Sequence, residues 1–272
     1  MKKKFTGERL ETTVFGRIAT EHLHRYALSL KYVENKIVLD IACGEGYGSD
    51  ILSKTAKFVY GVDIDKSTVE FARNKYSNGK IKFSVGSTSD IPLEDNSVDV
   101  ITSFETIEHH DEHIKMMMEL KRVLTPEGIL IISSPDKLYY SDNRGYKNKF
   151  HVKELYKNEF KGLIGRFFKN SQLLSQNHIN GISLILNEEN ISDIKLFTGS
   201  FNMINIKKRN PMFLVSIASD VPFEEQKISV FDGAKINSNS IEKATNDIKK
   251  TITFKVGQII LFPFRLIRKA IQ

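Results

Sequence analysis

The amino-acid sequence predicts an α/β fold, in which helices flank a mostly parallel sheet of seven strands with an antiparallel strand at its end. Two observations predict this class. Short apolar runs alternate with helical patterns from residue 36 to residue 133, and such alternation is typical of right-handed crossovers between parallel strands. The first run leads into a glycine-rich turn and the second ends in an acid, which places polar chemistry at one edge of the sheet.

The glycine-rich turn lies in the segment Ile-Val-Leu-Asp-Ile-Ala-Cys-Gly-Glu-Gly-Tyr-Gly, at residues 37–48. Gly44 and Gly46 lack a Cβ atom, so the backbone can adopt positive φ there and approach a ligand closely. The third glycine of the dinucleotide motif G-x-G-x-x-G is missing, and Asp40 precedes the turn. A carboxylate at that place suits a cationic amine better than a pyrophosphate. The segment therefore favours S-adenosylmethionine, whose methionine part carries an ammonium group, over NAD.

This arrangement, Asp-x-Ala-Cys-Gly-x-Gly at residues 40–46, resembles the first motif of class I S-adenosylmethionine-dependent methyltransferases. The resemblance implies a Rossmann-like methyltransferase sheet and an enzyme that transfers a methyl group. The opening of the chain, from Thr6 to Tyr26, resembles methyltransferases found in bacterial surface-polysaccharide gene clusters. In such enzymes the N-terminal helix can close over the cofactor, and Arg25 would then pair with the methionine carboxylate. A solvated helix face is the alternative for Arg25.

Two further segments complete the predicted cofactor site. The second strand, at residues 58–65, brings Asp63 about twenty residues beyond the glycine turn, where an acid can accept hydrogen bonds from both ribose hydroxyls; a helix N-cap is the alternative role. The third strand, at 81–85, runs into Gly-Ser-Thr-Ser-Asp-Ile-Pro-Leu, which resembles the family's third motif. Ser87 stands where that family usually has an aspartate on the adenine amino group, so the contact would pass to the Ser87 hydroxyl and nearby backbone. The residues predicted to bind the cofactor are Arg25, Asp40, Ala42, Gly44, Gly46, Asp63, Ile64, Ser87, Thr88, Phe104 and Glu105.

The later elements follow the same alternation. A polar connection at residues 135–146 is long and carries several tyrosines, which suit the stacking and hydrogen bonding that sugars require. We therefore predict a substrate-binding lid there. The other elements expected after residue 97 are a strand at 98–103, a helix at 114–124 stopped by Thr-Pro-Glu-Gly, a strand at 129–133, a helix at 153–167, and an antiparallel strand pair at 168–175 and 213–218.

The candidate catalytic residues follow the fourth strand, in Phe-Glu-Thr-Ile-Glu-His at residues 104–109. The family often carries a Phe-Glu-x-Ile-Glu-His variant there, close to the methyl donor. Under the favoured interpretation His109 or His151, with Glu108 nearby, is the general base that takes a hydroxyl proton, because an imidazole titrates near the working pH. A second interpretation, not favoured, is a divalent-cation site whose spacing resembles that of small-RNA 2′-O-methyltransferases. Its ligands would be Glu105, Glu108, His109 and His151. A third is that the glutamates only hydrogen-bond backbone amides around the cofactor.

Composition bears on the partners and the compartment. The net charge of +7 and the pI near 9.2 raise nucleic acid as a partner. The lysines are scattered, however, tryptophan is absent, and no zinc or RNA-binding spacing occurs, so a polynucleotide is not the favoured substrate. Cys43 is the only cysteine, which predicts no internal disulfide and a reducing, cytoplasmic compartment. We expect neither a secretory signal nor a membrane span.

Three regions are expected along the chain: an N-terminal cap helix at residues 1–35, a methyltransferase domain at 36–220 and a C-terminal extension at 221–272. The end of the extension, residues 247–272, is basic, aromatic-rich and amphipathic, and Pro263 interrupts its apolar run. This pattern is typical of a helix that lies in a membrane interface, which would place the enzyme at the inner face of the membrane. Docking on a partner subunit is the alternative, and the sequence leaves the oligomeric state open.

The function that these patterns favour is O-methylation of a sugar or glycan intermediate in surface polysaccharide biosynthesis, with S-adenosylmethionine as the cofactor. A methyltransferase for another small acceptor, such as a phospho-amine, a lipid quinone or a natural product, is the first alternative, because the same fold serves many acceptors. A non-catalytic cofactor-binding scaffold is the alternative from a different class of protein.

Overall fold

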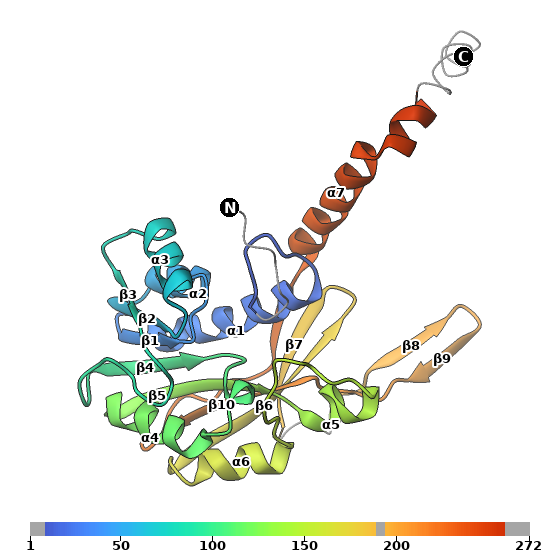
Figure 1. Ribbon diagram of the computed structural model, residues 1–272. Coiled ribbons are helices and arrows are strands. Elements are labelled where there is room, and N and C mark those ends of the chain that lie inside the picture. Colours follow the sequence, from blue (N-terminus) through green and yellow to red (C-terminus); the bar gives the residue numbers. More distant parts are fainter. Residues whose placement is uncertain (1–8, 189–193, 259–272) are drawn as a thin grey trace, which may run out of the picture.

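The computed structural model describes residues 9–188 and 194–258 and has one large sheet between two layers of helices (Figure 1). Strands and helices alternate through the first half of the chain, as the sequence predicts. The strands are β1 (Ile37–Ile41), β2 (Phe58–Asp63), β3 (Ile81–Val85), β4 (Val98–Ser103), β5 (Leu124–Pro135), β6 (Asn170–Ile179), β7 (Ile182–Asn187), β8 (Phe197–Ser200), β9 (Met203–Ile206), β10 (Phe213–Ser219) and β11 (Ser229–Asp232). The helices are α1 (Arg17–Val33), α2 (Tyr47–Ser53), α3 (Lys66–Lys75), η1 (Ile107–His109), α4 (His113–Val123), α5 (Lys137–Tyr140), η2 (Asp142–Arg144), α6 (Lys157–Gly165) and α7 (Ala234–Lys250).

The strands of the large sheet lie in the order β11-β7-β6-β10-β5-β4-β1-β2-β3. The half from β3 to β5 is parallel: β1 pairs with β2 and β4, β2 with β3, and β4 with β5. β10 then runs antiparallel to both of its neighbours, β5 and β6. β7 is antiparallel to β6, and β11 to β7. β8 and β9 form a separate hairpin. The carboxyl ends of the parallel strands therefore share one edge, where open α/β sheets bind ligands.

The predicted count of seven strands is wrong, because the sheet has nine strands in the part of the chain that the structure describes. β6 turns at Asn180 and Gly181, whose φ angles are +46° and +89°, and β7 pairs back on it with Ile179 opposite Ile182. β11 adds to β7. An Asn-Gly pair between two apolar runs is a strong hairpin signal, so the sequence contained evidence for β7. The mostly parallel sheet with an antiparallel strand is confirmed.

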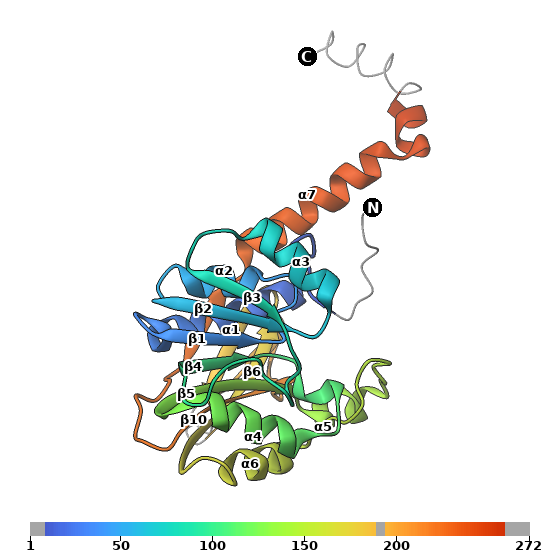
Figure 2. The same cartoon turned by 60° about the vertical axis from the view of Figure 1, so that its left-hand side comes forward.

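Helices cover both faces of the sheet, which Figures 1 and 2 show from two sides. α1 and α2 pack on the face that carries Val38 and Val100, and α4 and α6 pack on the face that carries Leu39 and Ile101. Neighbouring residues alternate between the two cores because successive side chains of a strand point to opposite sides. Strands covered on both faces read as continuous apolar runs, which is why β1 and β4 were recognisable in the sequence.

Several element bounds differ from those predicted. α4 ends at Val123 and β5 begins at Leu124, so the Thr-Pro-Glu-Gly segment starts the strand and does not separate the two elements. α6 begins only at Lys157, because the Glu159 side chain accepts a hydrogen bond from the Tyr156 backbone N–H (2.9 Å) and caps the helix there. The connection at 135–146 folds into α5 and η2. Among the described residues, no helix is long and apolar enough to cross a membrane.

Candidate active site

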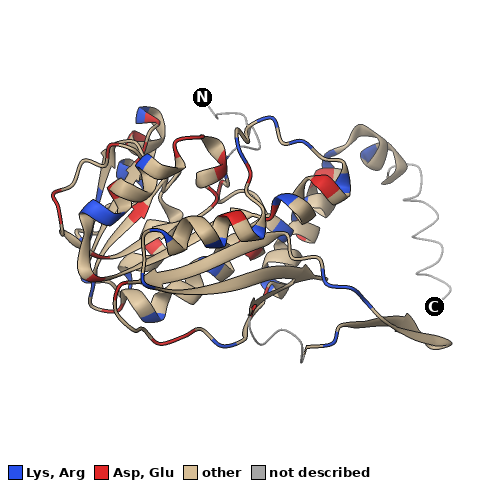
Figure 3. Ribbon diagram, turned by 90° about the horizontal axis from the view of Figure 1, so that it is seen from below, with Lys and Arg blue, Asp and Glu red and all other residues tan. Residues whose placement is uncertain are grey.

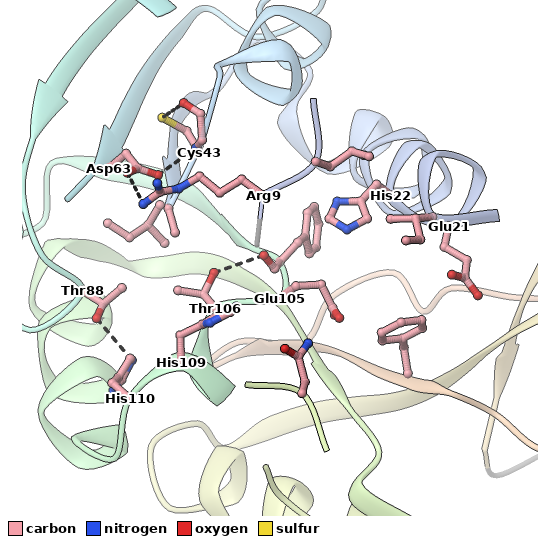
Figure 4. A pocket seen from close by; sticks show the side chains of 18 of the residues that line it. Arg9, Glu21, His22, Cys43, Asp63, Thr88, Glu105, Thr106, His109 and His110 are labelled. Carbon is pink, nitrogen blue, oxygen red and sulfur yellow. Dashed lines mark hydrogen bonds and ion pairs between the residues drawn. The ribbon is translucent and has the colours of Figure 1, made fainter. Parts of the chain in front are cut away.

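A cavity of about 720 Å³ lies at the carboxyl ends of β1, β2 and β4. Its walls come from the glycine turn, the ends of β2 and β3, the segment after β4, one side of α1, the α5–η2 segment and the start of β10. Figure 4 shows Asp63 and Thr88 on one side and Glu21 and His22 on the other, with Glu105 and His109 between them. The cavity therefore brings the predicted cofactor and catalytic segments together.

The glycine turn keeps one wall of the cavity open. Gly44 has a φ of +55°, and no heavy atom lies within 4 Å of the place its Cβ would take. Gly46, with a φ of +84°, packs instead against Phe83, whose ring lies 2.7 Å from the corresponding Cβ position. Gly44 and Ala42 line the cavity, whereas Gly46 lets the turn close against β3. An open wall of bare backbone suits a ligand that must approach the chain closely.

Asp40 lies beneath the turn and is fully buried. Its carboxylate accepts hydrogen bonds from Ser49 Oγ (2.7 Å), Thr102 Oγ1 (2.9 Å) and, at longer range, the Tyr26 hydroxyl (3.3 Å). Burial raises the pKa of Asp40 to about 6, although the three hydroxyl donors oppose this shift. Asp40 thus joins α1, α2 and β4 behind the cavity, and it is not one of the residues that line it.

Asp63 lies at the end of β2, where the sequence predicts the acid for the ribose. Its carboxylate accepts hydrogen bonds from the backbone N–H of Gly44 and of Asp65 (both 2.9 Å), which ties the end of β2 to the glycine turn. The Arg9 guanidinium also reaches Asp63 at 3.4 Å (Figure 4). The N-cap of α3 is Asp65, which accepts from the Thr68 N–H at 2.7 Å. Asp63 is therefore not the cap of that helix, and it faces the cavity.

The segment after β3 supplies the next part of the wall. Ile64, Ser87 and Thr88 all line the cavity. Ser87 forms a small bridge with Asp90, with backbone hydrogen bonds in both directions. The Thr88 hydroxyl lies 3.3 Å from Nε2 of His110, which links this segment to the one after β4. These three residues lie beside Asp63, where the nucleoside of a cofactor is expected.

Arg25 does not line the cavity, because its side of α1 faces β6 and β10. Its guanidinium is fully buried, donates to Gln176 Oε1 (2.7 Å) and lies over the Phe213 ring at 5.0 Å. Glu105 is its ionic partner at 3.7 Å. The α1 residues that do line the cavity are Arg17, Ile18, Glu21, His22 and Tyr26. The prediction that Arg25 binds the methionine carboxylate gains no support from this position.

The two glutamates after β4 differ in their surroundings. Glu105 lines the cavity at a positive φ of +52°, accepts a hydrogen bond from Ser133 Oγ (2.7 Å) and pairs with Arg25. Burial raises the pKa of Glu105, and Arg25 opposes that shift. The Glu108 carboxyl is buried and has no hydrogen-bond partner in the described part of the chain. Burial, reinforced by Glu105, raises the pKa of Glu108 well above its usual range, so the neutral acid is favoured there.

His109 is the histidine of the predicted motif that reaches the cavity. Its Nδ1 lies 3.1 Å from the Phe150 carbonyl oxygen. Because a carbonyl can only accept, Nδ1 donates the hydrogen and the neutral ring carries its basic lone pair on Nε2. This tautomer is the one that a general base requires.

His151 lies next to His109, with the two ring centroids 5.2 Å apart. Nδ1 of His151 lies 2.6 Å from Glu154 Oε1, and Nε2 accepts from the Asn148 amide at 2.9 Å. Both ring nitrogens are therefore engaged inside the protein. Asn148 lines the cavity, whereas His151 does not. The structure thus distinguishes two histidines that the sequence treats as equivalent candidates.

The divalent-cation alternative has partial geometric support. Ligand atoms of Glu108, His109 and His151 lie within 4.8 Å of one another. Glu105 is not in this group, since its carboxylate is held by Ser133 and Arg25. The unpartnered Glu108 carboxyl suits a cation, but His151 would have to give up one of its two present partners. Three of the four residues predicted for this alternative could therefore hold a metal without a change of fold.

Several cavity residues were not among the predicted site residues. Tyr140, Arg144 and Tyr146 belong to the segment predicted as a lid, and the Arg144 guanidinium stacks on both tyrosines, at 5.6 and 4.9 Å from the ring centres. Their signal in the sequence was the tyrosine content of that connection. Phe213 opens β10, and Arg9 lies in the opening segment at residues 6–26, but neither was among the predicted site residues. Both reach the cavity only through the fold.

The fold is one that S-adenosylmethionine-dependent methyltransferases of known structure share. The family described as "Methyltransferase domain" matches residues 39–132. Solved structures agree in fold: a methyltransferase of this class from Thermotoga maritima superposes with a TM-score of 0.55, at 17% identity over 75% of this chain and 91% of the other. One from Mesorhizobium loti has a TM-score of 0.53, at 15% identity over 73% and 97% of the two chains.

Curated relatives match the same region. A Mycolicibacterium smegmatis protein named as a probable S-adenosylmethionine-dependent methyltransferase is 39% identical over 119 residues, which cover 43% of this chain and 46% of the relative. The fatty-acid O-methyltransferase of the same organism is 26% identical over 129 residues, or 44% and 47% of the two chains. A phthiotriol/phenolphthiotriol dimycocerosates methyltransferase of Mycobacterium ulcerans is 28% identical over 116 residues, or 41% and 42%. The chain thus spans about half the length of the curated relatives it matches.

Proposed function

We propose that this protein is an S-adenosylmethionine-dependent O-methyltransferase in which His109 is the general base. The observation that carries the proposal is the position of His109: it lines the cavity beside the cofactor-binding segments, and the Phe150 carbonyl fixes the tautomer that leaves Nε2 basic. An imidazole in this form can take the proton of an acceptor hydroxyl. A non-catalytic scaffold would have no need of such a base in the cavity.

The chain's own residues suit the cofactor. Gly44 offers open backbone at the wall, and Asp63 presents a carboxylate to the ribose hydroxyls. Ile64, Ser87 and Thr88 would border the adenine. When bound, S-adenosylmethionine supplies a methyl group already activated by its positive sulfur, so the protein's main tasks are to align the acceptor and remove its proton. The Arg9 side chain, 3.4 Å from Asp63, would have to share this carboxylate with the ribose.

The residues around His109 support a transient positive charge on its ring. The Glu105 carboxylate interacts electrostatically with His109. Next to His109, Nδ1 of His151 lies 2.6 Å from Oε1 of Glu154. Glu108, held neutral by burial, would provide a polar neighbour without a second full charge. His151 would act mainly by positioning His109 and Asn148, since both of its nitrogens already have partners.

The acceptor we propose is a sugar or glycan intermediate of surface polysaccharide biosynthesis, methylated in the cytoplasm. Tyr140, Tyr146, Arg144 and Asn148 support it, because they give the α5–η2 side of the cavity aromatic rings with hydrogen-bonding groups. Such a mixture suits the hydroxyl-rich faces of a sugar. In this proposal residues 1–35 are a cap, 36–220 the catalytic domain and 221–272 an extension.

A second candidate acceptor is the hydroxyl or carboxyl group of a lipid. It is favoured by the relatives, one named as a fatty-acid O-methyltransferase and another as acting on phthiotriol and phenolphthiotriol dimycocerosates. Leu10, Ile18, Met212 and Phe213 give the cavity apolar lining as well. A lipid-linked glycan would satisfy both sets of contacts.

The experiment that tests the function is transfer of label from methyl-labelled S-adenosylmethionine into fractionated nucleotide sugars, glycolipids, fatty acids and phospho-amines. Label in the sugar or glycolipid fractions would support the glycan acceptor, and label only in fatty acids would support the lipid. Chelator is added in a parallel arm. Loss of transfer that Mg²⁺ or Mn²⁺ restores would favour the divalent-cation site over the metal-free base. Binding of S-adenosylmethionine without transfer to any fraction would favour the scaffold.

A further inference from the structure

The β8–β9 hairpin projects from the body of the protein and takes no part in the cavity (Figure 1). Its apolar side chains are open to solvent: Ile204 is 76% exposed, and Phe201, at the turn, is wholly exposed. The other exposed apolar residues of the hairpin are Phe197, Met203 and Ile206. Contiguous exposed apolar surface of this kind marks a site of interaction with another molecule or a membrane.

The strand register places three of these five residues, Phe197, Ile204 and Ile206, on one face. Phe197 lies opposite Ile206, and Gly199 lies opposite Ile204. Because opposed residues of two strands share a face and successive residues alternate, Phe197, Ile204 and Ile206 form one face, which we call the apolar face. Thr198 and Asn205, which are also opposed, lie on the other face together with Ser200 and Met203. One face of the hairpin is therefore more apolar than the other, and Phe201 extends the apolar surface at the tip.

Positive charge flanks the hairpin. Lys195 precedes β8, and Lys207, Lys208 and Arg209 follow β9. The sequence has no aspartate or glutamate from residue 194 to residue 219. Figure 3 shows the hairpin itself in tan, with blue on both strands where they leave the body. The apolar tip and the cationic base thus lie at opposite ends of the same projection.

We propose that the β8–β9 hairpin inserts its apolar face and Phe201 into the interface of an anionic lipid bilayer, with the exposed lysines Lys195, Lys207 and Lys208 on the headgroups. Interfacial binding grows with buried apolar area and with attraction between cations and anionic lipids, and the hairpin offers both. A second copy of this chain fits less well, because a symmetric pair of hairpins would bring two groups of exposed lysines together.

The hairpin is connected directly to the cavity. The chain runs from Arg209 into Met212 and Phe213, which line the cavity at the start of β10. Insertion of the hairpin would therefore hold the cavity near the membrane surface. This attachment is distinct from the predicted tail, of which residues 259–272 lie outside the described part of the chain. The proposed membrane attachment depends on the hairpin alone and does not require that the protein transfer methyl groups.

The first test uses the absence of tryptophan from the full chain. Phe201→Trp places a single tryptophan at the tip, and Asn205→Trp is the matched control on the face opposite the apolar face. The emission of the first variant should shift to the blue on addition of vesicles of equimolar phosphatidylcholine and phosphatidylglycerol, and that of the control should shift much less. Emission of Phe201→Trp that is already blue without lipid, and that reddens on dilution, would mean that a second copy covers the face.

The second test is co-sedimentation of the full chain with the same vesicles. Ile204→Ser together with Ile206→Ser should weaken binding about tenfold or more, whereas Thr198→Ser with Asn205→Ser should bind like the wild type. High salt and phosphatidylcholine vesicles should each weaken wild-type binding. Equal urea midpoints for all variants would establish that the fold is retained. Undiminished binding of the Ile204/Ile206 variant would assign attachment to another segment and overturn the proposal.

Discussion

The parallel half of the sheet and the β8–β9 hairpin contain the same kinds of residues in opposite surroundings. Leu39 and Ile101 of β1 and β4 are fully buried between two layers of helices, whereas Ile204 of β9 is 76% exposed. β1, β4 and β9 all carry branched apolar side chains. The difference lies in what covers them: β1 and β4 have helices on both faces, and the hairpin pairs only with itself. An apolar pattern therefore identifies a strand, but how much the strand stabilises the protein depends on whether other elements pack on its faces.

The largest effect on stability should come from truncating a buried side chain in the parallel half of the sheet. Ile101→Ala removes a fully buried side chain between α4 and β5 and should destabilise the protein by about 2–5 kcal/mol, because the cavity left behind relaxes only in part. Ile204→Ala is the matched change in the hairpin and should alter stability by less than about 0.5 kcal/mol. Urea unfolding measures both. Equal losses would mean that the hairpin is covered in solution.

The next effect concerns the base. His109→Ala should lower turnover about a hundredfold or more while S-adenosylmethionine still binds, and His151→Ala should cost less, because His151 does not line the cavity. His178→Gln is the control, since His178 lies on β6 and is not one of the lining residues. Turnover is followed with saturating cofactor. If His151→Ala proved the more damaging change, the assignment of the base would have to be reversed.

The third prediction uses the buried acid under the glycine turn. The folded-state pKa of Asp40 is raised to about 6 from an ordinary value of 3.8, so the native state binds the proton more tightly than the unfolded chain. Between about pH 4 and pH 6 the contribution of Asp40 to stability therefore falls as pH rises, by about 1–3 kcal/mol in all. Asp40→Asn should gain stability relative to the wild type across this window.

The check is the difference in urea unfolding free energy between Asp40→Asn and the wild type at pH 4.5 and at pH 7.5. Other titrating groups are common to both proteins and cancel in this difference. A difference that does not change with pH would show that Asp40 is hydrated in solution and that the region behind the glycine turn is less closed than the structure indicates.

The smallest effect concerns the affinity for S-adenosylmethionine at the predicted ribose site. Asp63→Asn keeps the shape of the side chain but removes the charged acceptor for the ribose, and it should weaken S-adenosylmethionine binding about tenfold. Asp65→Asn serves as the control, because asparagine caps a helix about as well as aspartate and Asp65 caps α3. Calorimetric titration measures both affinities. An unchanged affinity in Asp63→Asn would mean that the nucleoside lies elsewhere in the cavity.

The sequence by itself determined the elements whose signals are local. Continuous apolar runs specify strands that are buried on both faces. The glycines at 44 and 46 specify a turn with positive φ, because that conformation depends only on the backbone at those two positions. Asp63 could be located for the same reason, since it ends a recognisable strand. The Asn-Gly turn at 180–181 was equally local, and the extra strand β7 could have been predicted from it.

Tertiary structure alone decided how distant segments meet. Arg25 lies on a recognisable helix, but only the position of β6 and β10 directs its guanidinium to Gln176 and Phe213 and away from the cavity. His109 and His151 are separated in the sequence by α4, β5, α5 and η2, yet their rings lie side by side. The carbonyl of Phe150 sets the tautomer of His109. Hydrophobic periodicity and secondary-structure propensity indicate which local backbone conformation a segment adopts. Which side chain becomes a base, and which an internal support, depends on packing between segments that the local pattern does not encode.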